Sequence, residues 1–343
     1  MTIPCDKASR NRPRHVASVL AIALLSSACG GGGSGANAPQ ATDIRPLYKV
    51  TDAGPRGNFV VARDLDDAGR VVGNCSLDAS PTSTAAAFLW DAGILDEYSD
   101  RTLRALNSSG DLVGDANGVA YLWRGETAVP LAYGTAWDVS DTGVVVGEGA
   151  TGNGKLHAFL WHEGQLADLG TLGGEWSVAY GVNSEGTAVG WAEQADGQVR
   201  GFIWDSAGML AIDTLGGRWG MAYAVNDAGE VTGYSATIDG TDHAFIADSA
   251  GGVTDLGSLG GHSIGYDIDS RGRVVGESAD ASGRVCAFLW QESSIVDLNA
   301  LIPSESGWTL TRATAINDRG QIVGEGLFNG EKRPFLLTPI DDG

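Results

Sequence analysis

Apolar positions between residues 45 and 340 recur in short clusters, each of which follows a four-residue turn. In the first cluster, Asp66-Asp-Ala-Gly69 is followed by Arg-Val-Val-Gly73, and the same arrangement returns six more times. Asn, Asp or Ser at the first turn position with Gly at the fourth is typical of a hairpin turn. The closing glycines are Gly73, Gly114, Gly147, Gly190, Gly233, Gly276 and Gly324. Their spacings of 41, 33, 43, 43, 43 and 48 residues indicate an internal repeat of seven copies.

Each copy contains four pieces with the pattern of a short strand. In the fourth copy the first piece is Val178–Val182, before the turn, and the second is the apolar run that ends in Gly190. The third piece is aromatic, as in Ala158-Phe-Leu-Trp161, and the fourth contains an element such as Asp168-Leu-Gly-Thr-Leu-Gly-Gly174. Four short antiparallel strands in this length match a propeller blade. The sequence therefore predicts an all-β fold, a seven-bladed β-propeller of four-stranded antiparallel blades, with a β-solenoid as the alternative.

The two ends of the repeat region complement each other. The seventh copy stops near Ile340 and lacks a fourth strand, whereas Leu47–Asp52 resembles Gly252–Leu256, the fourth strand of copy five. We expect this N-terminal strand to complete the last blade and close the ring, which removes an open sheet edge.

The first 43 residues lack the repeat and have the pattern of an export signal. Basic residues lead into the apolar run Val16–Leu25, which is too short to span a bilayer. Small residues then precede Cys29, and this arrangement resembles a bacterial lipoprotein signal, in which the cysteine is acylated and begins the mature chain. An ordinary cleaved signal with an incidental cysteine is the alternative.

This resemblance divides the chain into three parts. We expect a signal peptide over residues 1–28, a lipidated Cys29 with a flexible Gly/Ser/Ala tether over residues 29–43, and the propeller over residues 44–343. Gly30 in place of an aspartate implies an outer-membrane lipoprotein, on the periplasmic side or at the cell surface.

Two recurring motifs resemble a known family. The triplets His157-Ala-Phe159 and His243-Ala-Phe245, together with the Asp-Leu-Gly-Thr-Leu-Gly-Gly element, are similar to the HAF extracellular repeat family. The likeness covers about residues 58–340 and is strongest over 157–290. Copies one, two and seven depart from it, with Ala86-Ala-Phe88, Val119-Ala-Tyr121 and Arg333-Pro-Phe335 in place of the triplet. The resemblance implies an exported repeat protein and supplies no catalytic or binding residues.

Composition and net charge limit the secondary structure and the classes of partner that we expect. Glycine supplies 51 of the 343 residues, about twice the ordinary share of roughly 7%, which favours turns and short strands over helices. The net charge of −21 excludes nucleic acid as an expected partner, because phosphate recognition needs a basic surface.

The sequence contains few motifs that are typical of catalysis or of metal binding. Gly261-His-Ser-Ile-Gly265 matches a serine-hydrolase elbow without the strand–turn–helix context that the elbow needs, and no His-Glu-x-x-His or Cys-x-x-Cys spacing occurs. We expect no catalytic residues, no cofactor and no metal centre. Calcium is a weaker possibility, held by Asp64, Asp66 and Asp67 or by Asp239 and Asp242, although such residues ordinarily bond the backbone of turns. Cys75 belongs to copy one and Cys286 to copy six, with copy seven between them, so we expect two free thiols. A single disulfide or a redox pair is the alternative.

Aromatic residues supply the candidate binding site. Trp90, Trp123, Trp161, Trp204 and Trp290 share one repeat position and are expected to fill the core. Large residues three positions before each turn are expected to pack between blades; these are Arg63, Arg104, Trp137, Tyr180, Tyr223, Tyr266 and Thr314. The connection that precedes the first strand carries the best exposed cluster, namely Glu175, Trp176, Arg218, Trp219 and His262. The alternative is that these tryptophans wedge between blades.

The sequence therefore predicts a cell-envelope lipoprotein scaffold, non-catalytic and monomeric, that binds a glycan or a protein ligand. A purely structural envelope component and a secreted polysaccharide-acting enzyme are the alternatives.

Overall fold

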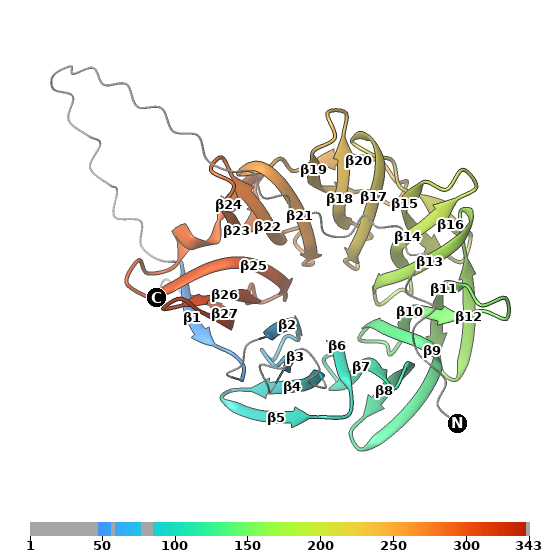
Figure 1. Cartoon of the computed structure of the whole chain (residues 1–343), viewed down its shortest axis with the longest axis horizontal. Helices are drawn as coiled ribbons and strands as arrows, with labels where there is room; N and C mark the ends of the chain where they lie inside the picture. Colours follow the sequence, from blue (N-terminus) through green and yellow to red (C-terminus); the bar gives the residue numbers. More distant parts are fainter. Residues whose placement is uncertain (1–46, 56–58, 77–84, 341–343) are drawn as a thin grey trace. The chain divides into compact units, whose positions relative to one another are not determined.

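A computed structural model describes residues 47–55, 59–76 and 85–340 (Figure 1). By its contacts the chain divides into residues 1–43 and 44–343, and all described residues belong to the second unit. The predicted signal peptide, Cys29 and the tether lie outside the described residues. In the described part of the chain, no helix is both long enough and apolar enough to cross a membrane.

Five of the sheets formed by the described residues have four antiparallel strands each. One consists of β2 (Phe59–Leu65), β3 (Val71–Ser76), β4 (Ala85–Asp91) and β5 (Ile94–Tyr98). The next consists of β13 (Gly173–Val182), β14 (Ala188–Gln194), β15 (Val199–Asp205) and β16 (Gly208–Ala211). It is followed by β17 (Gly216–Val225), β18 (Val231–Thr237), β19 (Asp242–Ala247) and β20 (Val253–Asp255). The fourth contains β21 (Gly260–Ile268), β22 (Val274–Asp280), β23 (Val285–Gln291) and β24 (Ser294–Asp297), and the 3-10 helix η1 (Leu298–Leu301) follows it. The fifth contains β1 (Tyr48–Asp52), β25 (Trp308–Ile316), β26 (Ile322–Phe328) and β27 (Glu331–Pro339).

Copies two and three share one seven-stranded sheet, so the prediction of seven separate four-stranded blades is not matched. This sheet has the order β12-β11-β10-β9-β8-β7-β6. Its strands are β6 (Thr102–Leu106), β7 (Asp111–Ala116), β8 (Val119–Arg124), β9 (Thr127–Val139), β10 (Val145–Ala150), β11 (Leu156–His162) and β12 (Gln165–Gly170). The physical reason is β9, a 13-residue strand that pairs with β8 through its first part and with β10 through its last. Copy two has no Gly-Gly element between β8 and β10 and has only a two-residue turn between β7 and β8, and both features contribute to its short spacing of 33 residues.

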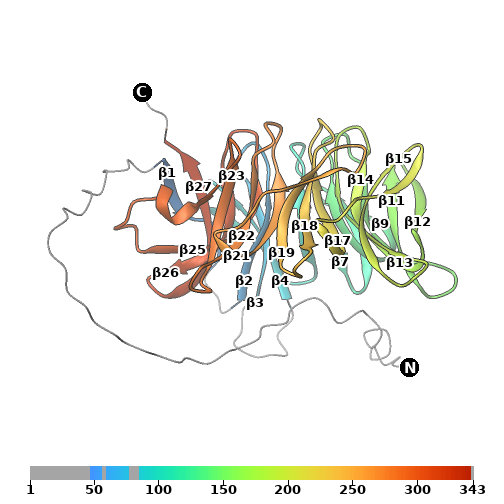
Figure 2. The ribbon, with the colours of Figure 1, turned by 90° about the horizontal axis from the view of Figure 1, so that it is seen from above.

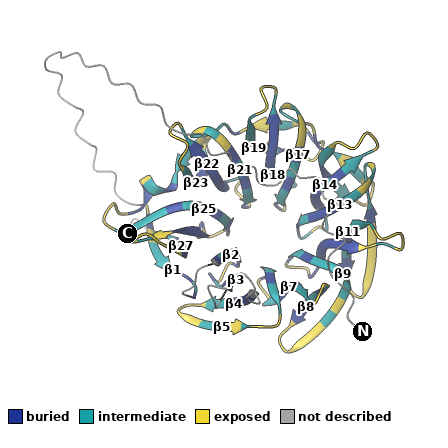
Figure 3. Cartoon of the chain, viewed as in Figure 1, coloured by how far each residue is buried: buried dark blue, intermediate teal, exposed yellow. Residues whose placement is uncertain are grey.

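The sheets stand side by side around a common axis, with the first strand of each repeat innermost (Figure 1). The strands run between the two faces of the ring (Figure 2). Innermost strands contact each other in chain order from β2 to β25, and β25 contacts β2 again. The described residues therefore form a β-propeller and not the open stack of a solenoid. Exposed positions gather on the outer strands and the turns, and buried positions lie in the strands nearer the axis (Figure 3).

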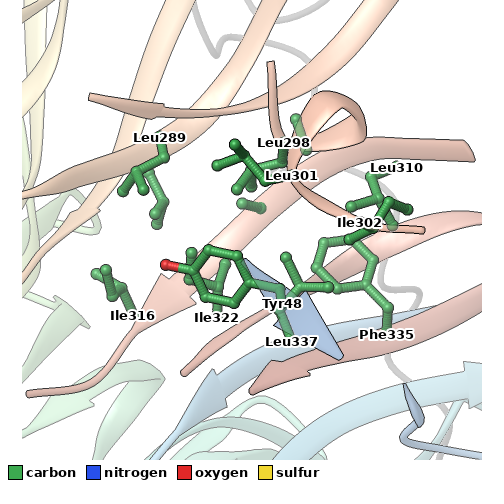
Figure 4. Close-up of a cluster of buried hydrophobic side chains, with 13 residues drawn as sticks. Tyr48, Leu289, Leu298, Leu301, Ile302, Leu310, Ile316, Ile322, Phe335 and Leu337 are labelled. Carbon is green, nitrogen blue, oxygen red and sulfur yellow. The ribbon is translucent and has the colours of Figure 1, made fainter. Parts of the chain in front are cut away.

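The N-terminal strand completes the last sheet, as the sequence predicts. β1 pairs antiparallel with β27, with Tyr48 opposite Pro339 and Asp52 opposite Phe335. Tyr48 is 5% exposed and packs into a core cluster with Leu337 and the neighbouring apolar side chains of β25 and η1 (Figure 4). Strands from the two ends of the repeat region are thus joined by backbone hydrogen bonds and by a shared core.

The closing glycine of each copy sits opposite an aromatic residue of the third strand. Gly73 pairs with Phe88, Gly190 with Phe202, and the other copies repeat this register. Phe88 and Phe202 are fully buried. The five predicted core tryptophans also contribute to these clusters: Trp123 and Trp161 are buried, and Trp90, Trp204 and Trp290 pack against core clusters while half-buried.

A belt of hydrogen bonds joins the turns between first and second strands all around the ring. Its donor–acceptor distances lie between 2.8 and 3.1 Å. The bonds run from Arg70 to Ser108, Asn107 to Ser140, Thr142 to Ser184, Asn183 to Asn226, Asn226 to Asp269, Ser270 to Asp318, and Asn317 to Asp66. The last of these spans 251 positions of sequence and closes the ring. We call this set the turn belt.

Candidate functional site

The predicted exposed cluster lies at the beginning of three innermost strands. Glu175 and Trp176 belong to β13, Arg218 and Trp219 to β17, and His262 to β21. The sequence placed them in connections, and the structure corrects this. The chain already pairs at the preceding glycines, since Gly173 lies opposite Gln194 and the same occurs in β17 and β21. Pairing then skips residues 174–176, 217–219 and 261–262, so the cluster occupies bulges that turn side chains out of the sheet. We call these five residues the strand-start cluster.

Trp219 is the most accessible indole of this cluster. Its side chain is 38% exposed, and its indole N–H donates to Asp242 Oδ1 at 2.9 Å. Burial raises the pKa of Asp242, and the Trp219 hydrogen bond together with the imidazoles of His262 and His243 acts against that rise. Asp242 therefore brings residues of β17, β19 and β21 together, in two neighbouring sheets.

Trp176 lies in a second group on the preceding strand. It is half-buried, and the Lys155 ammonium lies 5.0 Å from its ring centroid. Lys155 also forms an ion pair with the Glu175 carboxylate, and the Glu175 N–H donates to Glu193 at 2.8 Å. Between the two groups, the exposed Arg218 contributes its backbone carbonyl, which accepts from Arg200. The structure thus assembles two aromatic groups on adjacent strands, each fixed by charged neighbours.

The sequence did not predict how a second group of side chains, on the innermost strands, is arranged. The seven large residues three positions before the turns are each the extra residue of a β-bulge in an innermost strand. Period-two alternation assigned them to packing between blades, but a bulge breaks the alternation and re-aims the side chain. They are Arg63, Arg104, Trp137, Tyr180, Tyr223, Tyr266 and Thr314, and we call them the inner row.

Neighbouring members of the inner row touch one another. The Arg104 guanidinium lies 4.4 Å from the Trp137 ring centroid. Centroid distances are 5.1 Å from Trp137 to Tyr180, 5.3 Å from Tyr180 to Tyr223, and 5.5 Å from Tyr223 to Tyr266. The tyrosines do pack, but on each other around the axis. The sequence signal that could have found them is the closing glycine: a Cβ there would lie 1.9–2.2 Å from a first-strand carbonyl oxygen, two residues before the bulge.

Acidic side chains flank this row one strand further out. Arg312 Nε lies 2.5 Å from the Glu277 carboxylate and Arg312 Nη1 lies 3.3 Å from the Glu325 carboxylate, whereas Arg104 Nη2 lies 3.7 Å from the Asp115 carboxylate. These three carboxylates all immediately follow the closing glycine of their copy. The row is therefore lined by a mixture of guanidinium, phenol and carboxylate groups.

Three further carboxylates lie next to the inner row in sequence and bridge neighbouring copies. Asp64, Asp138 and Asp267 accept backbone N–H bonds from Leu106, Val182 and Ile316 at 2.8–3.0 Å. Burial raises the pKa of Asp138 to about 6 and that of Asp267 to about 7, and it raises the pKa of Asp64 as well, with Asp138 adding to that rise.

The aspartates considered for calcium have protein partners instead. Asp66 accepts from the backbone of Ala68 and Arg70 and from the Arg70 guanidinium, while Asp239 accepts from Thr237 and Thr241. Within residues 47–55, 59–76 and 85–340, no group of three or more His, Cys, Asp or Glu side chains is placed to hold a metal ion.

Residues of the HAF-type motifs form hydrogen bonds within a sheet and to the next sheet. His243 Nδ1 lies 3.0 Å from the Asp255 carboxylate, and fully buried Ser263 of the next sheet accepts from Ala244 N and donates to the Gly257 carbonyl. The Ser263 hydroxyl, which belongs to the elbow-like motif, therefore bonds backbone groups and not the imidazole. Cys286 occupies in copy six the strand position that His243 occupies in copy five. Both Cys286 and Cys75 are buried free thiols.

A cavity of about 670 Å³ lies elsewhere, at the outer part of the sheet that closes the ring. Its walls include Val50, Trp308 and Phe328, with Lys49 and Glu305 at its polar positions. It belongs to the junction between β1 and β25–β26 and touches neither the strand-start cluster nor the inner row.

Comparisons with known proteins agree with the fold. Residues 174–339 match a family described as "Protein of unknown function (DUF3466)". No curated protein matches this chain. A Mycobacterium tuberculosis puromycin-hydrolyzing peptidase is 11% identical with a TM-score of 0.51, over 82% of this chain and 49% of that chain. Pyrococcus horikoshii acylaminoacyl peptidase is 12% identical with a TM-score of 0.50, over 82% of this chain and 54% of that chain.

The putative TolB from Agrobacterium tumefaciens is 13% identical with a TM-score of 0.47, over 71% of this chain and 93% of that chain. Such low identities concern the fold alone. The chain spans about half the length of the two peptidases.

Proposed function

We propose that this protein is a non-catalytic binding scaffold of the bacterial cell envelope, which holds a glycan on the strand-start cluster. The observation that carries the proposal is Trp219, an exposed indole fixed by Asp242 beside His262. An aromatic ring with a polar handle that is held in one orientation loses little entropy on binding. Trp176, which lies on the adjacent innermost strand and is stabilised by Lys155, extends the same surface.

The repeat architecture supports a scaffold. In this proposal the two halves of the seven-stranded sheet act as two blades, which gives a monomeric ring of seven units. The likeness of the repeat to the HAF extracellular family agrees with an exported protein, and the acidic net charge of −21 agrees with a partner other than nucleic acid.

Binding to an immobilised glycan panel tests the proposal. We expect Trp219→Ala and Trp176→Ala each to weaken glycan binding at least about tenfold, because each removes a large contact area. Tyr133→Ala is the matched control, since Tyr133 is 77% exposed and lies outside the cluster. Equal binding by all three variants, or capture of no glycan by the unaltered chain, contradicts the proposal.

The lipid anchor is a separate part of the proposal. The apolar run Val16–Leu25 and the small residues before Cys29 support it. We expect Cys29→Ser to move the protein from the membrane fraction to the soluble fraction or to stall its processing. A variant that still fractionates with membranes, and is processed normally, contradicts lipidation.

A further inference from the structure

Three consecutive innermost strands present only hydrogen-bond donors at the inner-row position. Arg63 of β2 is exposed, and among the residues that the structure describes it has no hydrogen-bond or ion-pair partner. The Nε of Arg104 in β6 and the Nε1 of Trp137 in β9 are shielded from solvent and also lack an acceptor. Nearly all buried polar groups in proteins are hydrogen-bonded, so the shielded donors of Arg104 and Trp137, whose side chains contact each other, indicate a missing acceptor.

The charges around Arg63 indicate what kind of acceptor is missing. Although part of the Arg63 side chain reaches solvent, the surrounding protein desolvates its guanidinium, and this desolvation together with the guanidiniums of Arg104 and Arg312 lowers the pKa of Arg63 to about 10, against the opposite effect of Glu325 and Tyr266. Arg312 already pairs with Glu277 and Glu325, whereas Arg63 pairs with neither. A carboxylate is the usual partner of an arginine and accepts two parallel N–H bonds from it.

The rest of the inner row resembles a surface for a sugar ring. Beyond Trp137 the row continues with Tyr180, Tyr223 and Tyr266, whose rings supply apolar faces and whose hydroxyls donate or accept hydrogen bonds. The carboxylates that follow the closing glycines, such as Glu277, supply acceptors for sugar hydroxyls next to these rings. A free carboxylic acid without a ring would use the arginines and leave the tyrosines without a role.

We propose that the inner row binds a carboxylated sugar of the uronic acid class, with its carboxylate on Arg63 and its ring toward the tyrosines. Arg104 and Trp137 add their unpaired N–H donors after side-chain rotations of the kind that commonly accompany binding. This site lies four or more residues along the innermost strands from the strand-start cluster, since Tyr223 follows Trp219 by four positions. It is independent of the proposed function.

Isothermal titration of the full chain tests the proposal with three probes. Glucuronate carries both features, glucose lacks the carboxylate, and N-acetylglycine carries a carboxylate without a sugar ring. We expect glucuronate to bind at least about tenfold more tightly than either other probe, because only glucuronate can use both parts of the row. If N-acetylglycine binds as tightly as glucuronate, the site is a simple carboxylate site and the sugar assignment is wrong.

Arg63→Gln is the decisive variant, and Arg319→Gln is its matched control. Arg319 is an exposed arginine of a turn whose side chain takes part in no described ion pair. We expect Arg63→Gln to weaken glucuronate binding about tenfold or more and Arg319→Gln to leave it unchanged. Because Arg63 has no hydrogen-bond or ion-pair partner in the part of the chain that the structure describes, its variant should melt at the wild-type temperature, which separates lost binding from lost folding. Unchanged glucuronate binding by Arg63→Gln overturns the proposal, whatever the outcome for Trp176 and Trp219.

Discussion

Two kinds of bulge are repeated among the innermost strands, and the two differ in how many copies contain them. The bulge near the turn is present in every copy and always faces the closing glycine of the second strand. The bulge that carries the strand-start cluster occurs in β13, β17 and β21, after the Gly-Gly element that these strands share. The first therefore belongs to the architecture of the ring, and the second belongs to particular copies.

The side chains at the recurrent bulge are nevertheless varied. Arginine stands there in copies one and two, tryptophan in copy three and tyrosine in copies four to six. A constant backbone with changing side chains separates two requirements: the fold needs the bulge, and the chemistry depends on what the bulge presents. Four changes test this separation.

The largest effect is expected from filling the space opposite the recurrent bulge. In Gly190→Ala the new Cβ would lie 1.9 Å from the Val178 carbonyl oxygen. The strands cannot separate without breaking their hydrogen bonds, so we expect a loss of at least about 3 kcal/mol in the free energy of unfolding, measured in urea. Gly152→Ala is the control, because no atom lies within 4 Å of its added Cβ. Similar unfolding curves for both variants would show that the glycine is not required.

A smaller effect is expected from opening the turn belt. Asn317→Ala removes the bond to the Asp66 carbonyl and two turn bonds, from Arg319 N and Gln321 N. We expect a loss of about 1–3 kcal/mol in the free energy of unfolding. Asn183→Ala removes the equivalent bonds between copies four and five, which do not close the ring, and should lower the free energy of unfolding by a similar amount. A clearly smaller cost at Asn317 than at Asn183 would indicate that the ring is not closed between the last and first copies, because Asn317→Ala would then lose only its turn bonds.

The next effect depends on pH. Burial raises the pKa of Asp267 from its ordinary value of 3.8 to about 7 in the folded protein. Between about pH 4 and pH 7 the unfolded chain holds fewer protons than the folded chain at this group, so rising pH removes stability from the wild type. Asn does not titrate and avoids this loss.

We therefore expect the unfolding free energy of Asp267→Asn, relative to wild type, to improve as the pH rises through that window. The change should be about 1 kcal/mol or more, since one pKa unit corresponds to about 1.4 kcal/mol. Urea unfolding across the window measures it, with the exposed Asp196→Asn as control. A difference that does not vary with pH contradicts the raised pKa.

The smallest effect on stability is expected at the strand-start cluster. Trp219→Ala removes a side chain that is already 38% exposed, and we expect it to cost about 1 kcal/mol of folding stability. Trp161→Ala, at a position 7% exposed, should cost about 3–5 kcal/mol. Thermal melts of the two variants decide whether Trp219 is a surface residue. A melt as low as that of Trp161→Ala would place it between sheets and remove it as a binding residue.

The repeat made most of the fold predictable. The turn sequences, the aromatic third strands and the missing fourth strand of the last copy predicted antiparallel four-stranded units and the pairing of β1 with β27. The shared sheet of copies two and three was not predicted, although the 33-residue spacing contained the signal. A count of copies does not reveal that one strand, β9, serves two of them.

The candidate sites were predicted less completely. Exposure of Glu175, Arg218, Trp219 and His262 agrees with the sequence interpretation, but their place within strands does not. The inner row was assigned to packing because alternation along a strand assumes that every residue is paired. An unpaired residue in each first strand cannot be recognised from one strand alone, because the bulge depends on the register of its partner.

Local structure could be predicted from the order of the residues: where each chain segment turns, which residues alternate, and which glycines and aromatic residues recur. These properties depend on backbone conformation and side-chain volume over a few residues. Which residues meet around the axis depends instead on how the copies are arranged in three dimensions. Arg63, Arg104 and Trp137 are 74 positions apart from first to last, and the bond from Asn317 to Asp66 spans 251. Closure of the ring brings these groups together, and closure is a property of all the copies at once.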